Sequence, residues 1–152
     1  MNVRLRQAED GEAEVLSVLA MASKARWNYP PDMLEAWRPA LTVSADYVRS
    51  HLVRVLELEG RVVGFFAIVP AKNRLDHFWL RPEAIGLGLG RVMFAHASRL
   101  SREHGLRYLL IVSDPHAEGF YLRMGARRIG VEPSGPNRML PVLRCEVPPA
   151  AD

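Results

Sequence analysis

The spacing of apolar residues changes near Leu52, and this change constrains the fold more than any other feature of the sequence. Three apolar segments with strand-like character follow one another there, at Leu52 to Leu58, Arg61 to Val69 and Leu75 to Leu80. A turn at Glu59-Gly60 and a second turn near residues 71–73 separate them. Short alternating segments with such turns between them are typical of antiparallel strands. We therefore expect an antiparallel meander over residues 52–80.

A strand and helices are expected before this meander. Val3 and Leu5 alternate with arginines as a first strand, and Asp10 is expected to cap a helix. Residues 22–41 hold prolines and aromatic residues that break the periodicity, so this segment predicts a short helix at best. Residues 44–51 predict a further helix that begins at Ser44. The first helix is predicted to bury Ala13, Val15, Leu16, Leu19 and Ala20.

Helices and strands alternate after the meander. A glycine-rich loop precedes a helix over residues 89–104, which Gly105 ends, and Tyr108 to Ser113 is an apolar strand suited to a sheet centre. Asp114 and Pro115 are expected to begin the next helix as N-cap and first residue. Gly125 ends that helix, and two strands follow at Ala126 to Val131 and Met139 to Val147. The helix over 89–104 is predicted to bury Val92, Met93, Ala97 and Leu100.

This order of elements predicts the α/β class, with a mixed central sheet of about six to seven strands flanked by helices. The 152 residues suit a single domain, expected over residues 2–147, with a disordered tail at 148–152. No apolar run approaches the roughly 20 residues needed to cross a bilayer, so no membrane association is expected. A single cysteine, Cys145, excludes an intrachain disulfide and fits a cytoplasmic protein. The five histidines have no metal-site spacing, so no metal is expected.

The net charge of +3 is a weak indication of an anionic partner. The basic residues are 18 arginines and 2 lysines, spread along the chain and mixed with 17 acidic residues. Because a nucleic-acid site requires a clustered basic surface, we do not expect nucleic acid to be a partner.

Three glycines at alternate positions, Gly86, Gly88 and Gly90, lie between the third strand of the meander and the following helix. Without side chains, their backbone can approach a ligand closely, and successive amides at a helix N-terminus suit phosphate oxygens. Arg91 adds positive charge. The spacing is neither that of a Rossmann loop nor that of a Walker loop. The loop therefore indicates a phosphate site of another kind, the alternative being a tight turn without a ligand.

The segment from Phe78 through Ala126 resembles the GCN5-related N-acetyltransferase superfamily in the order and spacing of its motifs. The resemblance rests on the strand before Pro82, the loop 86–91, and Asp114, Ala117, Phe120, Tyr121 and Gly125. It implies acetyl-CoA as the cosubstrate. It also implies that the backbone from Phe78 to Leu80 pairs with pantetheine, and that Asp114 and Tyr121 lie near the thioester. The amides expected to hold the pyrophosphate are those of Gly86, Gly88, Leu89, Gly90 and Arg91.

Three positions depart from the superfamily pattern. Ile85 stands where the family usually has Gln or Arg, which removes one side-chain contact to phosphate. Asp114 replaces the common Asn and adds a negative charge beside pantetheine. Leu109 stands where some members carry a glutamate base, so another base is required or none acts.

Tyr121 is the candidate general acid, because a phenol with a pKa near 10 can donate a proton to a departing thiolate. Its alternative role is packing beside Phe120. Asp76 shares a strand face with Phe78 and Leu80 and is the candidate base, the alternative being an ion pair with a nearby arginine. His77 points to the other face and is expected to be packed or hydrogen-bonded, so it ranks second as a base.

The aromatic residues Trp27, Tyr29 and Trp37 either line the acceptor site, as the resemblance implies, or pack in the core. Arg99 and Arg102 either contact the 3′-phosphate of CoA or form a solvated helix face. The resemblance thus implies an N-acetyltransferase in which an amine attacks the thioester directly, without a covalent enzyme intermediate. A small-molecule acceptor is favoured, and a peptide amine and a homodimer remain open. The alternative is a non-catalytic acyl-CoA-binding module.

Overall fold

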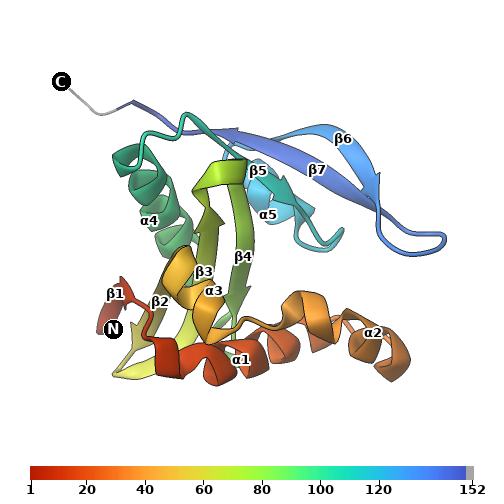
Figure 1. The fold of residues 1–152 in the computed structure, drawn as a ribbon, viewed down its shortest axis with the longest axis horizontal. Coiled ribbons are helices and arrows are strands. Elements are labelled where there is room, and N and C mark those ends of the chain that lie inside the picture. The colour runs from red at the N-terminus through yellow and green to blue at the C-terminus, as the bar shows by residue number, and fades with distance from the viewer. Residues whose placement is uncertain (150–152) are drawn as a thin grey trace. The chain divides into compact units, whose positions relative to one another are not determined.

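The structure is a computed structural model that describes residues 1–149 (Figure 1). Seven strands form one mixed sheet in the order β1-β2-β3-β4-β5-β7-β6, which confirms the predicted α/β class. The strands are β1 (Val3–Gln7), β2 (Leu52–Leu58), β3 (Arg61–Val69), β4 (Arg74–Leu80), β5 (Tyr108–Val112), β6 (Arg127–Pro133) and β7 (Met139–Glu146). The α-helices are α1 (Ala13–Ala25), α2 (Pro31–Leu41), α3 (Ala45–Ser50), α4 (Leu89–Glu103) and α5 (Glu118–Arg123).

The chain forms two compact units. The first contains residues 1–67 and 77–93, and the second contains residues 68–76 and the chain from Phe94 onward. The boundaries between the units fall within β3, β4 and α4, so each of these three elements contributes residues to both units. The expected single domain over 2–147 stays a prediction, and the last three residues of the expected tail lie outside the described residues.

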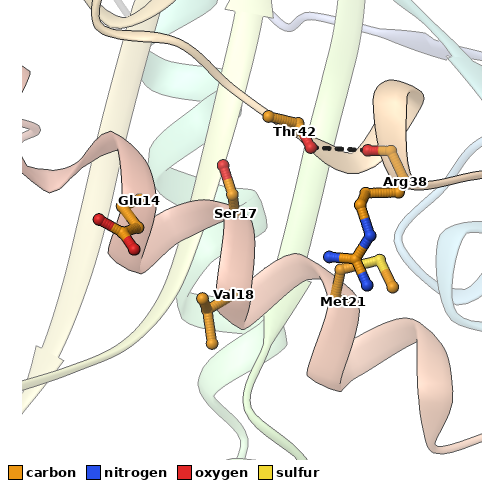
Figure 2. Close-up of a pocket in the computed structure, with 6 residues that line it drawn as sticks. All are labelled: Glu14, Ser17, Val18, Met21, Arg38 and Thr42. Atoms are coloured by element: carbon orange, nitrogen blue, oxygen red, sulfur yellow. Dashed lines mark hydrogen bonds between the residues drawn. The ribbon is translucent and has the colours of Figure 1, made fainter. Parts of the chain in front are cut away.

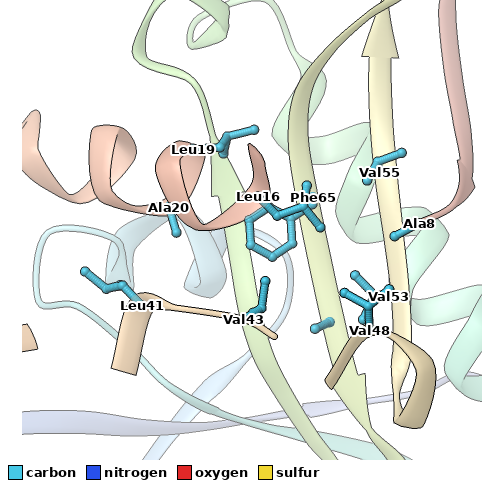
Figure 3. Close-up of a cluster of buried hydrophobic side chains, with 11 residues drawn as sticks. Ala8, Leu16, Leu19, Ala20, Leu41, Val43, Val48, Val53, Val55 and Phe65 are labelled. Atoms are coloured by element: carbon cyan, nitrogen blue, oxygen red, sulfur yellow. The ribbon is translucent and has the colours of Figure 1, made fainter. Parts of the chain in front are cut away.

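The core of the first unit lies between α1 and its strands (Figure 3). Leu16 and Leu19 of α1 are fully buried with Phe65 of β3, and Val53 and Val55 of β2 belong to the same cluster. Burial of large apolar side chains of this kind is the main favourable contribution to folding. This part of the predicted core is therefore confirmed.

Two of the predicted core residues are exposed. Val15 is 44% exposed and Val92 is 43% exposed. A helix advances 100° per residue, so the buried stripe of α1 runs through Leu16, Leu19 and Ala20 and leaves the preceding valine outside it. Val92 likewise precedes the buried Met93 on α4.

The segment between α1 and α3 contains more helix than expected. Helix α2 has 11 residues, with Pro31 at its start, where a missing N–H costs nothing, and Pro39 inside its last turn. The expectation of a short helix at best was therefore wrong. At the N-terminal end of α1, Glu9 and Glu12 form a capping box around a 3-10 turn, so Asp10 is not the cap.

Helix α3 begins as predicted. The Ser44 side chain accepts a hydrogen bond from the Tyr47 amide at 3.0 Å and thereby satisfies one donor of the first turn. The turn between β2 and β3 is also as predicted, since Glu59 and Gly60 both have positive φ, of 52° and 80°. Such a two-residue turn matches the twist of an antiparallel hairpin.

In the second unit, β5 pairs with β7 antiparallel and meets β4 in parallel at Arg74 and Leu110. Leu109 and Ile111 are buried, as expected for a central strand. The next helix begins later than predicted, because residues 115–117 form a turn and α5 starts at Glu118. Asp114 is thus not an N-cap.

Candidate functional site

The glycine-rich loop has an open backbone. Gly86 and Gly88 have φ of +89° and +80°, which side chains rarely adopt, and a Cβ placed on either would meet no heavy atom within 4 Å. Both glycines are exposed. The loop therefore requires glycine for its conformation and leaves its backbone accessible to a ligand.

Helix α4 begins directly after these glycines, at Leu89. The first N–H groups of an α-helix have no acceptor within the helix and carry a partial positive charge. Here they are the amides of Leu89, Gly90 and Arg91. Leu89 as a whole is 1% exposed, so its side chain offers no contact to a ligand, whereas Arg91 is exposed. The arrangement suits an anion bound by backbone donors.

Strand β4 has two different faces. Leu75 and His77 are buried on one face, whereas Asp76, Phe78 and Leu80 alternate with them and remain partly exposed. The strand therefore presents the predicted pantetheine-binding residues on its more accessible face. At its end, the Arg81 amide donates to the Val63 carbonyl at 2.7 Å.

His77 is packed, as the sequence predicted. Its ring stacks on Phe65 with centroids 5.7 Å apart and meets Tyr47 edge-on at 5.6 Å. The Trp79 indole N–H donates to His77 Nδ1 at 2.9 Å. Since that nitrogen accepts a hydrogen bond, it carries no proton. The contacts account for His77 as a core residue.

Asp76 has an arginine partner. Its Oδ1 lies 3.3 Å from Arg74 Nε, and both side chains are partly exposed. The ion pair is the alternative role considered for this carboxylate from sequence. The role of Asp76 as a base stays a prediction.

Tyr121 is buried among aromatic rings of the second unit. It is 7% exposed, and its ring lies 5.3 Å from Phe120 and 6.2 Å from Phe94. Burial, and secondarily the negative charge of Asp114, raises the pKa of the Tyr121 phenol above its ordinary value. The pKa of Tyr121 in the free protein therefore lies above the ordinary phenol value on which the sequence argument relied, and its role as general acid stays a prediction. The phenol keeps its proton and is suited to donate a hydrogen bond to a developing negative charge.

The side chain of Asp114 is almost fully buried, and nitrogen atoms of His116 and Arg138 lie around it. Oδ1 accepts from the His116 amide at 2.8 Å and lies 3.0 Å from His116 Nδ1. Oδ2 lies 3.7 Å from a guanidinium nitrogen of Arg138. His116 and Arg138 were not singled out from the sequence. The position of His116 two residues after Asp114 is the Asx-turn spacing that could have indicated it, whereas nothing in the sequence pointed to Arg138.

The aromatic residues after α1 surround a cation. Tyr29 and Trp37 meet edge-on at 4.7 Å, and the Lys24 ammonium lies 5.3 Å and 4.9 Å from their ring centroids. The Arg26 guanidinium lies 4.0 Å from the Trp27 ring. Cation–π contacts of this kind are stabilising. They give these aromatic residues a structural role without testing whether they also line the acceptor site.

A surface pocket of about 330 Å³ lies between α1 and α2 (Figure 2). On the α2 side of the pocket, Thr42 Oγ1 donates a hydrogen bond to the Arg38 carbonyl oxygen at 2.7 Å. None of the predicted cofactor or catalytic residues lines this pocket. Its lining residues are Glu14, Ser17, Val18, Met21, Arg38 and Thr42.

The predicted site residues fall into both units. Phe78, Leu80 and the loop residues 86–91 belong to the first unit, and Asp76, Asp114 and Tyr121 belong to the second. Within residues 1–149, no group of three or more His, Cys, Asp or Glu side chains is placed to hold a metal ion. In the same part of the chain, no helix is both long and apolar enough to cross a membrane.

The fold is that of N-acetyltransferases of known structure. A GCN5-related N-acetyltransferase from Rhodopseudomonas palustris superposes with a TM-score of 0.81 at 18% identity, covering 96% of each chain. A second similar structure is PaiA N-acetyltransferase from Thermoplasma acidophilum in complex with coenzyme A. Its TM-score is 0.78 at 18% identity, and the match covers 96% of this chain and 99% of that chain. A third is the yncA protein from Salmonella typhimurium with its cofactor acetyl-CoA. Its TM-score is 0.68 at 16% identity, and the match covers 100% of this chain and 98% of that chain.

The sequence identifies the family directly. The profile of the acetyltransferase (GNAT) domain matches residues 32–135, more than half of the chain. The chain belongs to this family, which confirms the resemblance drawn from the loop and from the segment after Asp114. A comparison with curated proteins gave no match.

Proposed function

We propose that the chain is an acetyl-CoA-dependent N-acetyltransferase that transfers the acetyl group to an amine by direct attack on the thioester. The observation that carries this proposal is the loop before α4. Gly86 and Gly88 are exposed in a conformation that suits glycine, and the first amides of α4 follow them. A pyrophosphate needs several converging donors and no obstructing side chain, and these residues fit that need.

In this proposal, the loop amides from Gly86 to Arg91 hold the pyrophosphate, and Phe78 and Leu80 hold pantetheine through their backbone. Leu89 and Gly90 contribute amides only. Asp114 lies beside the thioester end of acetyl-CoA, and Tyr121 donates a proton to the departing sulfur. Backbone donors of β4 stabilise the negative charge that develops on the thioester oxygen. Acetyl-CoA supplies the activated acyl group, and the chain supplies binding, orientation and proton transfer.

The acceptor in this proposal is a small-molecule amine, with a peptide amine as the alternative acceptor, and the protein acts in the cytoplasm. Two observations favour a second function, that of a non-catalytic acyl-CoA-binding module. Asp76, the candidate base, is paired with Arg74, and Ile85 provides no side-chain donor to phosphate.

Two measurements test the proposal and separate it from this second function. Native mass spectrometry of the purified protein should detect co-purified CoA or acetyl-CoA, which both functions require. Release of free CoA thiol should then be followed with acetyl-CoA and four probes: a primary alkylamine, an amino acid, a peptide with a free N-terminus and a peptide with an internal lysine. Turnover with any of them supports the enzyme. Binding without turnover across the panel contradicts it and favours the binding module.

A further inference from the structure

The surface pocket between α1 and α2 contains none of the residues proposed for acetyl transfer. Its volume of about 330 Å³ is that of a site for a small molecule. Glu14 lies three residues before Ser17 and four before Val18, so these side chains share one face of α1, and Met21 continues this face (Figure 2). The other two lining residues belong to α2 and its C-cap, and the whole pocket lies in the first unit.

The two hydroxyl groups that line the pocket already use their hydrogens. Ser17 Oγ donates to the Ala13 carbonyl oxygen at 2.9 Å, and Thr42 Oγ1 donates to the Arg38 carbonyl oxygen at 2.7 Å. A hydroxyl group has a single hydrogen to donate but can also accept. Towards a ligand, these two side chains therefore act as acceptors and not as donors.

The positive charge of Arg38 is balanced by a neighbour on its own helix. Its Nε donates to one carboxylate oxygen of Glu35 at 3.0 Å, and a terminal guanidinium nitrogen donates to the other oxygen, also at 3.0 Å. Two parallel hydrogen bonds of this kind are the favoured geometry between arginine and a carboxylate. Because the pair is neutral as a whole, Arg38 adds little net charge to the pocket.

Glu14 carries the charge that remains. Within the part of the chain that the structure describes, its carboxylate has no hydrogen-bond or ion-pair partner. Next to it on the same helix face, Val18 is 57% exposed and Met21 is partly exposed, so apolar surface lies beside the negative charge. A ligand with a cationic head and an apolar chain matches both features.

We propose that this pocket binds a primary alkylammonium ion, with the ammonium group on the Glu14 carboxylate and the alkyl chain over Val18 and Met21. An ammonium group donates hydrogen bonds and accepts none, which suits a lining with a carboxylate and hydroxyl acceptors. An anion would be repelled by Glu14, and a neutral alcohol would gain only the apolar contact. This inference goes beyond the proposed acetyl transfer, because the site needs neither the cofactor loop nor acetyl-CoA.

A titration of wild type with n-hexylammonium chloride tests the site directly. Proteins labelled with ¹³C in the methionine methyl groups report on Met21, whose signal is identified by its loss in Met21→Leu. We expect this signal to shift saturably. n-Hexanol and hexanoate have the same chain with no charge and with the opposite charge. Both should bind at least about threefold more weakly, because an exposed ion pair contributes up to roughly fivefold in affinity.

Two variants separate the charge from the apolar contact. In Glu14→Gln, the Kd for hexylammonium should rise at least about threefold and approach that for hexanol. Glu103→Gln is the matched control, since Glu103 is an exposed glutamate at the end of α4 that does not line the pocket, and its Kd should equal that of wild type. Because a carboxylate in the first turn of α1 also favours the helix, circular dichroism checks that Glu14→Gln is folded.

Several results would overturn the proposal. These are equal affinities of wild type for hexylammonium and hexanol, tighter binding of hexanoate, an unchanged Kd in folded Glu14→Gln, or no saturable shift of the Met21 methyl signal. The comparison of the three probes on wild type decides the matter even if Glu14→Gln does not fold. Since the titrations contain no acetyl-CoA, failure of this site and failure of acetyl transfer are observed separately.

Discussion

Gly64 of β3 lies close to atoms of β4 and α4 in the first unit. A Cβ at this position of β3 would lie 2.8 Å from Leu80 Cδ2, 2.9 Å from Met93 Sδ and 3.0 Å from the Trp79 carbonyl oxygen. The two side-chain ends can shift, but the carbonyl belongs to the backbone of β4. Gly64→Ala therefore requires these two side chains to shift and the backbones of β3 and β4 to move apart.

The size of the effect follows from two opposing contributions. Overpacking costs about 1–3 kcal/mol, whereas replacing glycine by alanine recovers about 0.4–1 kcal/mol by restricting the unfolded chain. The net expectation is a loss of about 1–2 kcal/mol in the free energy of unfolding. For a chain of this length, that lowers Tm by about 2–8 °C.

The loss in the free energy of unfolding is measured by urea titration, with circular dichroism as the signal. Gly11→Ala is the matched control, because no atom lies within 4 Å of a Cβ at that position, and it should leave stability unchanged or slightly increased. If Gly64→Ala unfolds at the same urea concentration as Gly11→Ala, the close approach at Gly64 is not a constraint and the reasoning is refuted.

Three further predictions concern catalysis and pH. Tyr121→Phe should cut kcat between about tenfold and a thousandfold with CoA affinity little changed; a kcat within about twofold of wild type, with chemistry rate-limiting, would make Tyr121 a packing residue. Asp76→Asn should lower kcat/KM mainly at neutral pH, where the amine must lose a proton, and an equal loss at every pH indicates a positioning role instead. The hydrogen bond from Arg6 lowers the pKa of the Glu12 carboxyl in the folded protein. The ionised Glu12 therefore stabilises the fold at neutral pH, and this contribution is lost as the pH falls below about 4.5. Urea unfolding of Glu12→Gln should therefore show a weaker pH dependence than wild type between pH 7 and pH 3, and an unchanged dependence contradicts the assignment.

The order of elements could be predicted from the sequence because local signals agree with the fold. Ser44 is both a good N-cap and the observed one, and the Glu59-Gly60 turn separates two strands at their observed ends. Helix faces were less predictable. Val15 and Val92 are apolar and adjacent to buried positions, and hydrophobicity alone does not show that a residue lies just outside the buried stripe. Helix α2 was underestimated because Pro30 and Pro31 were read as interruptions of the periodicity, although they lie at the N-cap and the first position of the helix.

The candidate site could be predicted in part for a similar reason. Alternate glycines carry their own conformational signal, and Gly86 and Gly88 have the positive φ that it implies. The partners of charged side chains depend on tertiary structure, so the contacts of Asp114 with His116 and Arg138 were not foreseen. The raised pKa of Tyr121 depends on burial, which its position in the motif does not reveal.

Calorimetric titration with CoA tests the central claim, that the loop before α4 binds the pyrophosphate. Gly88 has φ of +80°, a region that Asn and Asp tolerate better than other side chains. The variants Gly88→Asn and Gly88→Asp therefore place side chains of the same shape on the same backbone conformation and differ by one negative charge. We predict that wild type binds CoA saturably and that Gly88→Asp binds at least about tenfold more weakly than Gly88→Asn, because its carboxylate repels the phosphates. Equal CoA affinity in the two variants, or no binding by wild type, would contradict the account.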